Sequence, residues 1–369
     1  MHRYQLAACS ARVFAVPLVL SGSVAAAPPA AAAARIGSLA PAAAFSASRG
    51  VLTGVAAASG RSAWAVGYAN AAANGCGTCR TLILRWNGAA WKQVPSPSPE
   101  GSGFLLAVAA ASGRDAWAVG GTGIGVSTRP LIVRWNGAAW KRVPSPGPAG
   151  GSGLSGVAAT SARNAWAVGS VASKPLILRW NGIRWTRARI PALPAGGSLV
   201  AIAATSARSA WAVGGTDTGN ALILRWNGTG WRRARIPALA GGTLTGIAAT
   251  SARSAWAVGG TATGNALILR WNGIGWTRAR IPALPAGDSL VAIAATSARS
   301  AWAVGGTDTD KTLIVRWNGI AWKRLPSLPA ASGGFLAAVA ATSARNAWAA
   351  GDTASGKALI LHWNGAAWK

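Results

Sequence analysis

The chain has 369 residues, of which 51% are hydrophobic and 21 are tryptophan, and its 36 Lys and Arg residues against seven acids give a formal net charge of +29. With two histidines and so few acids, the sequence offers no recurring nucleophile and base and no convergent carboxylate pair, which argues against an enzyme. We expect no catalytic residue, no metal site and no cofactor. The large positive charge favours an anionic partner.

Residues 1–27 are typical of an export signal. His2, Arg3 and Arg12 precede a short apolar run at residues 13–20, and the alanines at 25–27 offer a small-residue cleavage site. An uncleaved membrane anchor is the alternative, but the prolines in this stretch disfavour a spanning helix. We therefore expect an extracellular or cell-wall-associated protein with no transmembrane span in the mature chain.

From residue 49 to residue 369 one pattern repeats seven times and contains all 21 tryptophans. Each repeat reads A-W-A-V-G and then L-I-(L/V)-R-W-N-G-x-x-W, at intervals of about 45 to 53 residues. This period is typical of four-stranded propeller blades. We predict an all-β fold, a seven-bladed β-propeller of four-stranded antiparallel blades, formed by one chain as a monomer.

The fourth repeat predicts four short strands, at residues 199–204 (a), 210–214 (b), 222–226 (c) and 231–236 (d). The small residues of strand a suit the crowded ring centre, and the prolines after strand d suit an outer edge. Asn227 and Gly228 are a strong signal for a hairpin between c and d, because both tolerate the positive φ of a type I′ turn, and the loop is expected to have two or four residues.

The tryptophans favour a structural role over ligand stacking, because all seven sets are equivalent by position. Their spacing places the second and third tryptophan of a repeat on one face of the c–d hairpin. We expect this pair to pack against the strand b tryptophan of its own or a neighbouring blade. Two such sets are Trp64, Trp86 and Trp91, and Trp211, Trp226 and Trp231.

Residues 28–48 are expected to form a linker that includes a ring-closing strand within residues 34–40. The string A-R-I-G-S-L at 34–39 resembles A-R-I-P-A-L at 188–193, so this segment is expected to complete the last blade. An open ring is the alternative.

The motifs A-W-A-V-G and R-W-N-G-x-x-W resemble the Trp-rich propeller repeats of secreted bacterial proteins, which typically read D-V-W-A-V-G and H-W-N-G-x-x-W. A looser similarity extends to tectonin-type lectin propellers and to sialidase-like propellers. This chain departs from the pattern, because the Asp before the strand b tryptophan occurs only as Asp115 and the His before W-N-G only as His362. The resemblance implies a propeller without a settled activity.

Two surfaces are candidates for binding. The length between the tryptophans of strands b and c varies, so the b–c loops at residues 68–80, 121–129 and 216–220 are one candidate, with Tyr68, Asp217, Asn220 and Asp308 as ligand-binding residues; neutral loop drift is the alternative. The opposite face is expected to carry a ring of seven arginines in the a–b turns. These are Arg61, Arg114, Arg163, Arg208, Arg253, Arg299 and Arg345.

That ring could attract polyanions such as wall polymers, acidic polysaccharides or nucleic acid. The alternatives are that one exposed arginine was copied by duplication, or that each arginine stacks on a tryptophan. No motif indicates specific nucleic-acid recognition.

Cys76 and Cys79 form a C-G-T-C string, for which a local disulfide is expected in an oxidising compartment; a redox or zinc site would need further ligands or a helix. Together these features predict a secreted, non-catalytic binding module that recognises a glycan or an anionic cell-surface polymer. A structural or protein-interaction scaffold is the alternative, and an unrecognised glycan hydrolase or lyase is a third.

Overall fold

The computed structural model describes residues 50–69, 79–98, 102–123, 127–146, 151–193, 196–239, 241–326 and 333–369. The predicted signal peptide, the linker at 28–48 and the closing segment within 34–40 lie outside these residues and stay predictions. No helix in the described ranges is long and apolar enough to cross a membrane.

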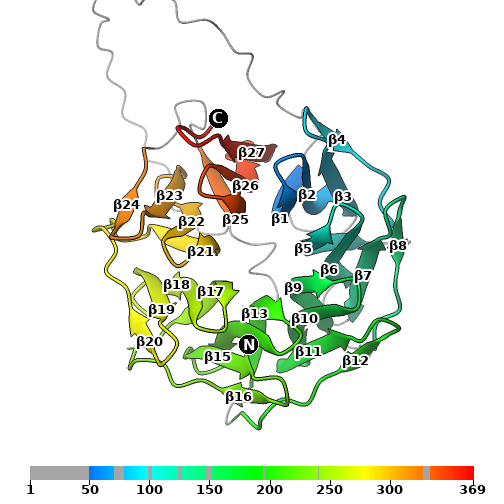
Figure 1. The fold of residues 1–369 in the computed structure, drawn as a ribbon, viewed down its shortest axis with the longest axis horizontal. Coiled ribbons are helices and arrows are strands. Elements are labelled where there is room, and N and C mark those ends of the chain that lie inside the picture. The colour runs from blue at the N-terminus through cyan, green and yellow to red at the C-terminus, as the bar shows by residue number, and fades with distance from the viewer. Residues whose placement is uncertain are drawn as a thin grey trace, which may run out of the picture.

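Seven antiparallel sheets surround a central axis, which confirms the predicted propeller (Figure 1). Blade 1 comprises β1 (Gly50–Ser59), β2 (Ser62–Ala69), β3 (Arg80–Trp86) and β4 (Trp91–Gln93). Blades 2 and 3 comprise β5 (Gly103–Ser112), β6 (Asp115–Thr122), β7 (Arg129–Trp135) and β8 (Trp140–Arg142), then β9 (Ser152–Ser161), β10 (Asn164–Val171), β11 (Lys174–Trp180) and β12 (Trp185–Arg187).

Blades 4 and 5 comprise β13 (Gly197–Ser206), β14 (Ser209–Thr216), β15 (Ala221–Trp226) and β16 (Trp231–Arg233), then β17 (Thr243–Ser251), β18 (Ser254–Gly260), β19 (Ala266–Trp271) and β20 (Trp276–Arg278). Blades 6 and 7 comprise β21 (Ser289–Ser297), β22 (Ser300–Gly306), β23 (Thr312–Trp317) and β24 (Trp322–Arg324), then β25 (Gly334–Ser343), β26 (Asn346–Thr353) and β27 (Ala358–Trp363). In blade 7 an isolated bridge between Trp363 and Trp368 stands where the fourth strand begins in the other blades.

Strand a lies innermost and strand d outermost in the ring, as the small residues of strand a and the prolines after strand d predict (Figure 1). In blade 4 the outer strand is shorter than the predicted 231–236. It ends at Arg233, and the last bond to the sheet is donated by Ala234 N to Ile223 O at 2.9 Å. The chain then leaves the sheet towards Pro237, which has no N–H to donate.

The c–d hairpin has the longer of the two expected loops and does not form a type I′ turn. In blade 4 its loop has four residues, because Trp226 pairs directly with Trp231, and only Gly228 takes a positive φ, of 101°. The side chain of Asn227 instead accepts hydrogen bonds from the N–H groups of residues 229 and 230, at 3.1 and 3.0 Å. The Asn-Gly pair therefore works through an Asn side-chain turn followed by one glycine.

The tryptophans join neighbouring blades. Trp166 of blade 3 meets Trp226 and Trp231 of blade 4 with ring centroids 5.1 and 5.3 Å apart, the second pair edge to face at 87°. The same triad recurs at every seam, and the seven strand b indoles are at most 2% exposed. Contacts of this kind contribute roughly 0.5 to 1.5 kcal/mol per aromatic pair beyond the apolar area that they bury.

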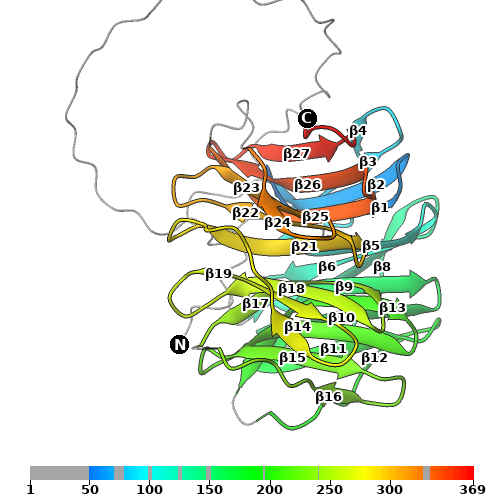
Figure 2. The same ribbon diagram turned by 60° about the vertical axis from the view of Figure 1, so that its left-hand side comes forward.

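Blades 7 and 1 lie side by side (Figure 2), and side chains packed between them close the ring. The ring centroid of Trp348 lies 4.9 Å from that of Trp86 and 5.2 Å from that of Trp91. Those two indoles are half-buried, whereas their counterparts in the other blades are buried. At other seams the chain after strand d supplies cover, as Ile190 does for blade 4, and the described part of blade 7 supplies no equivalent.

Candidate binding surface

The seven arginines of the a–b turns, here called the turn arginines, have firmly held backbones. In blade 4 the N–H of Arg208 donates to Ser206 Oγ at 3.2 Å, and the carbonyl of Ala207 accepts Trp226 Nε1 at 3.0 Å. Both bonds recur in all seven blades. The turn is thus fixed by its own serine and by an indole of the same blade.

The stem of each turn arginine lies against the glycine of the c–d turn in its own blade. A Cβ atom added to Gly228 would lie 3.3 Å from Arg208 Cβ, and the equivalent glycines of the other blades meet their own arginines in the same way. All seven turn arginines are exposed. The c–d glycine therefore provides both the positive φ and the room for the arginine stem.

No acid neutralises the turn arginines within the described part of the chain. The ion pairs there join Arg134 to Asp115 at 2.8 Å and Arg324 to Asp288 at 3.3 Å, and neither arginine belongs to the turns. We call the face that carries the a–b and c–d turns the arginine face.

A second set of arginines, on strand c, makes the cation–π contacts that were one alternative for the turn arginines. Arg225 lies 4.9 Å from the ring of Trp211 in its own blade and 5.1 Å from Trp271 in the next. The other members are Arg85, Arg134, Arg179, Arg270 and Arg316. The signal for this role was present in the sequence, because an arginine precedes W-N-G in six repeats.

In blade 7 His362 replaces the strand c arginine. Its ring stacks on Trp348 with centroids 4.0 Å apart, and its Nε2 lies 2.8 Å from Asn346 Oδ1. Burial lowers the pKa of His362 below its usual 6.5, so the neutral ring is favoured in the folded protein.

The residue two positions before the strand b tryptophan faces this strand c position. In blade 2 Asp115 Oδ1 accepts from Arg134 Nε at 2.8 Å, while Arg134 Nη2 reaches the carbonyl of Ala162 in blade 3 at 3.1 Å. In blade 4 this position is Ser209, and both Ser209 Oγ and Arg225 Nε are buried without a protein partner; blades 1 and 6 show the same arrangement. The two positions at which this chain departs from the D-x-W and H-W-N-G patterns therefore face each other, one on strand b and one on strand c.

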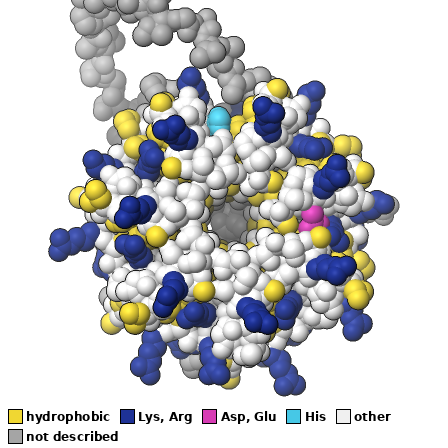
Figure 3. All heavy atoms as spheres, viewed as in Figure 1, with side chains coloured by type: hydrophobic (Ala, Val, Ile, Leu, Met, Phe, Trp, Pro, Cys, Tyr) yellow, Lys and Arg dark blue, Asp and Glu magenta, His cyan; other side chains and the backbone are white. Residues whose placement is uncertain are grey.

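Charge is divided between the two faces. Among the six acids in the described ranges, only Asp115 lies at the arginine face, and it is paired. The others lie in b–c loops, before strand a or, for Asp352, near the end of strand b: Asp217, Asp288, Asp308, Asp310 and Asp352. Figure 3 shows Lys and Arg side chains all round one face of the ring, with acidic side chains at one place only.

The b–c loops offer fewer free groups than expected. Tyr68 lies within β2 and is 4% exposed, so its ring is not displayed on the surface, and its role in ligand binding stays a prediction. Asn220 bonds within its own loop, through its N–H to Thr216 Oγ1 at 3.1 Å and its Nδ2 to Thr218 Oγ1 at 3.0 Å. Asp217 and Asp308 are exposed but belong to different blades.

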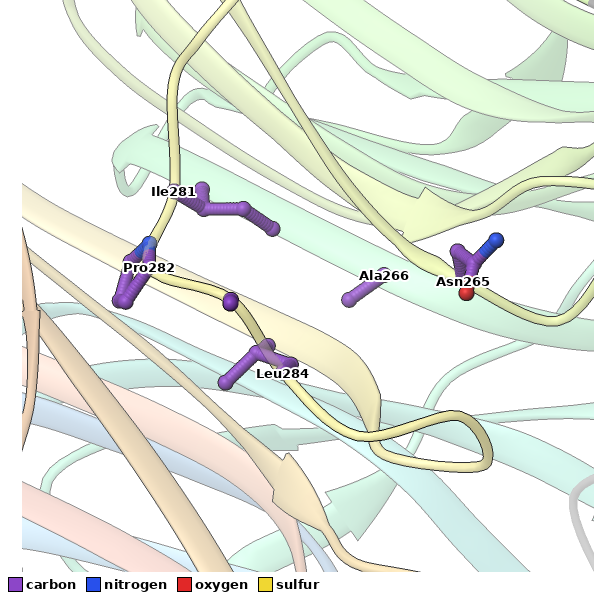
Figure 4. A pocket seen from close by; sticks show the side chains of 6 residues that line it. Asn265, Ala266, Ile281, Pro282 and Leu284 are labelled. Atoms are coloured by element: carbon purple, nitrogen blue, oxygen red, sulfur yellow. The ribbon is translucent and has the colours of Figure 1, made fainter.

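One recess opens beside a b–c loop of blade 5 (Figure 4). It has a volume of about 230 Å³ and lies between Asn265 and Ala266 on one side and the chain after strand d, residues 281–284, on the other. Asn265 provides the one polar side chain, and its Nδ2 bonds to Thr263 Oγ1 at 2.9 Å. The recess is apolar and holds no group able to act as an acid, a base or a nucleophile.

Cys79 is buried and disulfide-bonded. Cys76 lies outside the described residues, so the pairing of Cys76 with Cys79 stays a prediction. Within the described ranges no three His, Cys, Asp or Glu side chains gather in a group that could hold a metal ion.

No protein-family model matches the chain, and no curated protein sequence does either. Among solved structures the chain is similar to YCF48 from Cyanidioschyzon merolae, with 18% identity, a TM-score of 0.57 and coverage of 86% of this chain and 96% of that one. It is also similar to the SapL1 lectin in complex with alpha methyl fucoside, with 14% identity, a TM-score of 0.51 and coverage of 76% and 97%.

A third similar structure is the GH74 xyloglucanase from Xanthomonas campestris, with 15% identity and a TM-score of 0.61, in which the match covers 86% of this chain and 52% of that chain. Similarity at such identities shows the propeller fold alone. The same fold thus occurs in a lectin, in a glycoside hydrolase and in YCF48.

Proposed function

We propose that this protein is a non-catalytic binding module that recognises an anionic glycan of the cell surface through its arginine face. The observation that carries the proposal is the ring of seven exposed turn arginines without an acid partner in the described residues. The planar guanidinium group suits carboxylate, sulfate and phosphate groups, and seven weak contacts on one rigid ring add up on a repeating polymer.

The burial of the tryptophans favours an anionic ligand over a neutral sugar. Neutral sugars are commonly held against exposed aromatic faces, but only Trp86 and Trp91 are half-buried, and the remaining indoles in the described ranges are buried. Export, predicted from residues 1–27, would bring the arginine face to cell-surface polymers.

A protein-interaction scaffold is the second candidate. A solved structure of YCF48 bound to D1 peptide shares the fold at 14% identity, and the apolar recess of blade 5 could receive an aliphatic side chain of a protein. This alternative leaves the charge of the arginine face without a role.

The test compares two variants of equal net charge. The first replaces Arg208, Arg253, Arg299 and Arg345 with Gln, and the control replaces Arg80, Arg129, Lys174 and Lys357 on the b–c face with Gln. Binding to a carboxylated polysaccharide and to neutral dextran is measured at rising salt concentration. We expect the first variant alone to lose most of the affinity for the charged polymer and to show a shallower salt dependence. Equal losses in both variants, or no binding by the unmodified protein, would contradict the proposal.

A further inference from the structure

The most exposed large apolar side chains among the described residues all occupy one position of the repeat. Ile183, Ile274 and Ile320 are 84%, 91% and 87% exposed, and each follows the glycine of a c–d turn, in blades 3, 5 and 6. The other blades place Ala89, Ala138, Thr229 and Ala366 there. Single exposed apolar residues are ordinary on a protein surface, but three at equivalent turn tips on one face form a pattern.

Each isoleucine stands beside a turn arginine. The stem of Arg163 lies against Gly182, where an added Cβ would be 3.3 Å from Arg163 Cγ, and Ile183 is the next residue. The backbone of the tip is held, because Ile183 N–H donates to Asn181 Oδ1 at 2.9 Å. The same arrangement pairs Ile274 with Arg253 and Ile320 with Arg299.

A polymer in water gives these isoleucines little to contact, whereas a lipid bilayer offers an apolar layer directly beneath anionic headgroups. Tips that combine an aliphatic side chain with a long cation suit this boundary, because the aliphatic group enters the acyl region while the guanidinium stays at the phosphate level. Each basic residue near an anionic leaflet adds attraction.

The charge around these tips is complementary to such a surface. Blades 3 to 6 also expose arginines on strand d, among them Arg187, Arg232 and Arg278, and their arginine face carries no acid in the described ranges. We propose that the arginine face docks on an anionic lipid bilayer, with Ile183, Ile274 and Ile320 entering the headgroup boundary. This inference rests on the proposed anion-binding role of the same face and names a lipid surface as its partner.

The test measures co-sedimentation of the full chain with vesicles of phosphatidylcholine alone and of phosphatidylcholine containing about 30% phosphatidylglycerol. The triple variant Ile183→Ala, Ile274→Ala, Ile320→Ala gives these tips the residue of blades 1, 2 and 7. We expect it to lose at least about tenfold in partitioning to the anionic vesicles and to keep its melting temperature and its binding to the carboxylated polysaccharide. The reciprocal variant Ala89→Ile, Ala138→Ile, Ala366→Ile should bind the vesicles more tightly than the unmodified protein.

The outcomes separate this inference from the proposed function. Polysaccharide binding with vesicle binding that the isoleucine changes leave unaltered would overturn the lipid inference and leave the proposed function in place. Failure to bind either the polysaccharide or the anionic vesicles would overturn both. Equal binding to neutral and anionic vesicles would also overturn the inference, because the turn arginines would then play no part.

Discussion

The substitution Ser209→Asp should stabilise the protein by completing a side-chain pair that blade 2 already contains. In blade 2 Asp115 accepts from Arg134 Nε at 2.8 Å, with the two side chains 11% and 27% exposed. In blade 4 the strand register is the same, and Arg225 Nε and Ser209 Oγ are buried without protein partners. An aspartate at 209 can therefore reach the guanidinium without movement of either strand.

We expect a gain in the free energy of unfolding because Arg225 Nε is already buried. Burial of Arg225 Nε is complete before the substitution, so the new contact adds mainly a charge-assisted hydrogen bond and costs the partial burial of one carboxylate. For a half-buried pair of this geometry we expect about 1 kcal/mol in the free energy of unfolding. The reverse change, Asp115→Ser, should lose a similar amount.

The assay is urea unfolding followed by tryptophan fluorescence, at low and high salt concentration. Any added acid lowers the net charge of a strongly basic protein, so Ala262→Asp is the control; it copies Asp217 of blade 4 and Asp308 of blade 6 in a loop without a nearby arginine. We expect the midpoint to rise for Ser209→Asp by more than for the control. A rise no larger than that of Ala262→Asp would show that net charge, and not the Asp–Arg contact, accounts for the effect.

Three further changes test other parts of the structure. Gly273→Ala should lower the free energy of unfolding by about 1 kcal/mol, because Gly273 has a φ of 98° and the added Cβ would lie against Arg253. Gly275→Ala in the same turn is the control; its added Cβ meets no atom, so the urea midpoint should stay unchanged. Below about pH 6.5 we expect the unmodified protein to lose stability, because His362 takes up a proton in the unfolded chain that the buried ring resists, and His362→Arg should remove this loss. Urea unfolding of both proteins at pH 7.5 and 5.5 tests this, and an equal dependence on pH in the two proteins would refute it. Deletion of residues 35–39 should lower the melting temperature if this segment completes blade 7, and an unchanged melting temperature would count against it.

The sequence predicted the blade count, the strand order and the inner position of strand a, because a motif repeated seven times has one simple closed solution. It left open which blade each tryptophan would contact. That choice depends on the twist between sheets, and the structure places Trp166 against Trp226 and Trp231 of the following blade. Periodicity within a strand does not contain that angle.

The candidate surface was less predictable than the fold. The spacing placed the turn arginines in the a–b turns. Each of six repeats also has an arginine on strand c, however, and the sequence does not show which of the two stacks on a tryptophan. The structure assigns it to strand c, where Arg225 lies directly opposite Trp211 across the strands. Tyr68 was expected in a loop but lies in a strand, because β2 extends to Ala69 and is buried from Ala63 to Tyr68.

Packing explains the stem of a turn arginine but not its charge. Any long side chain would cover the glycine of the c–d turn. Other positions of the outer strand do vary: the residue opposite the strand c arginine is Lys92 in blade 1, Thr186 in blade 3 and Arg232 in blade 4. At the turn position arginine is present in all seven blades. Blades 4 to 6 are nearly identical copies, but blades 1 and 2 carry different turns, S-G-R-S and S-G-R-D, and keep the arginine.

A strictly structural origin would also favour nearby acids, because seven cations of one sign on one ring repel each other and weaken the compact state. The described acids lie instead in the b–c loops, before strand a and at the end of strand b in blade 7, apart from Asp115, which pairs with a strand c arginine. The guanidinium groups of the arginine face therefore have no counterpart within the described part of the molecule. We propose that an anionic surface outside the molecule supplies the missing charge, and the two binding tests ask whether that surface is a polymer or a bilayer.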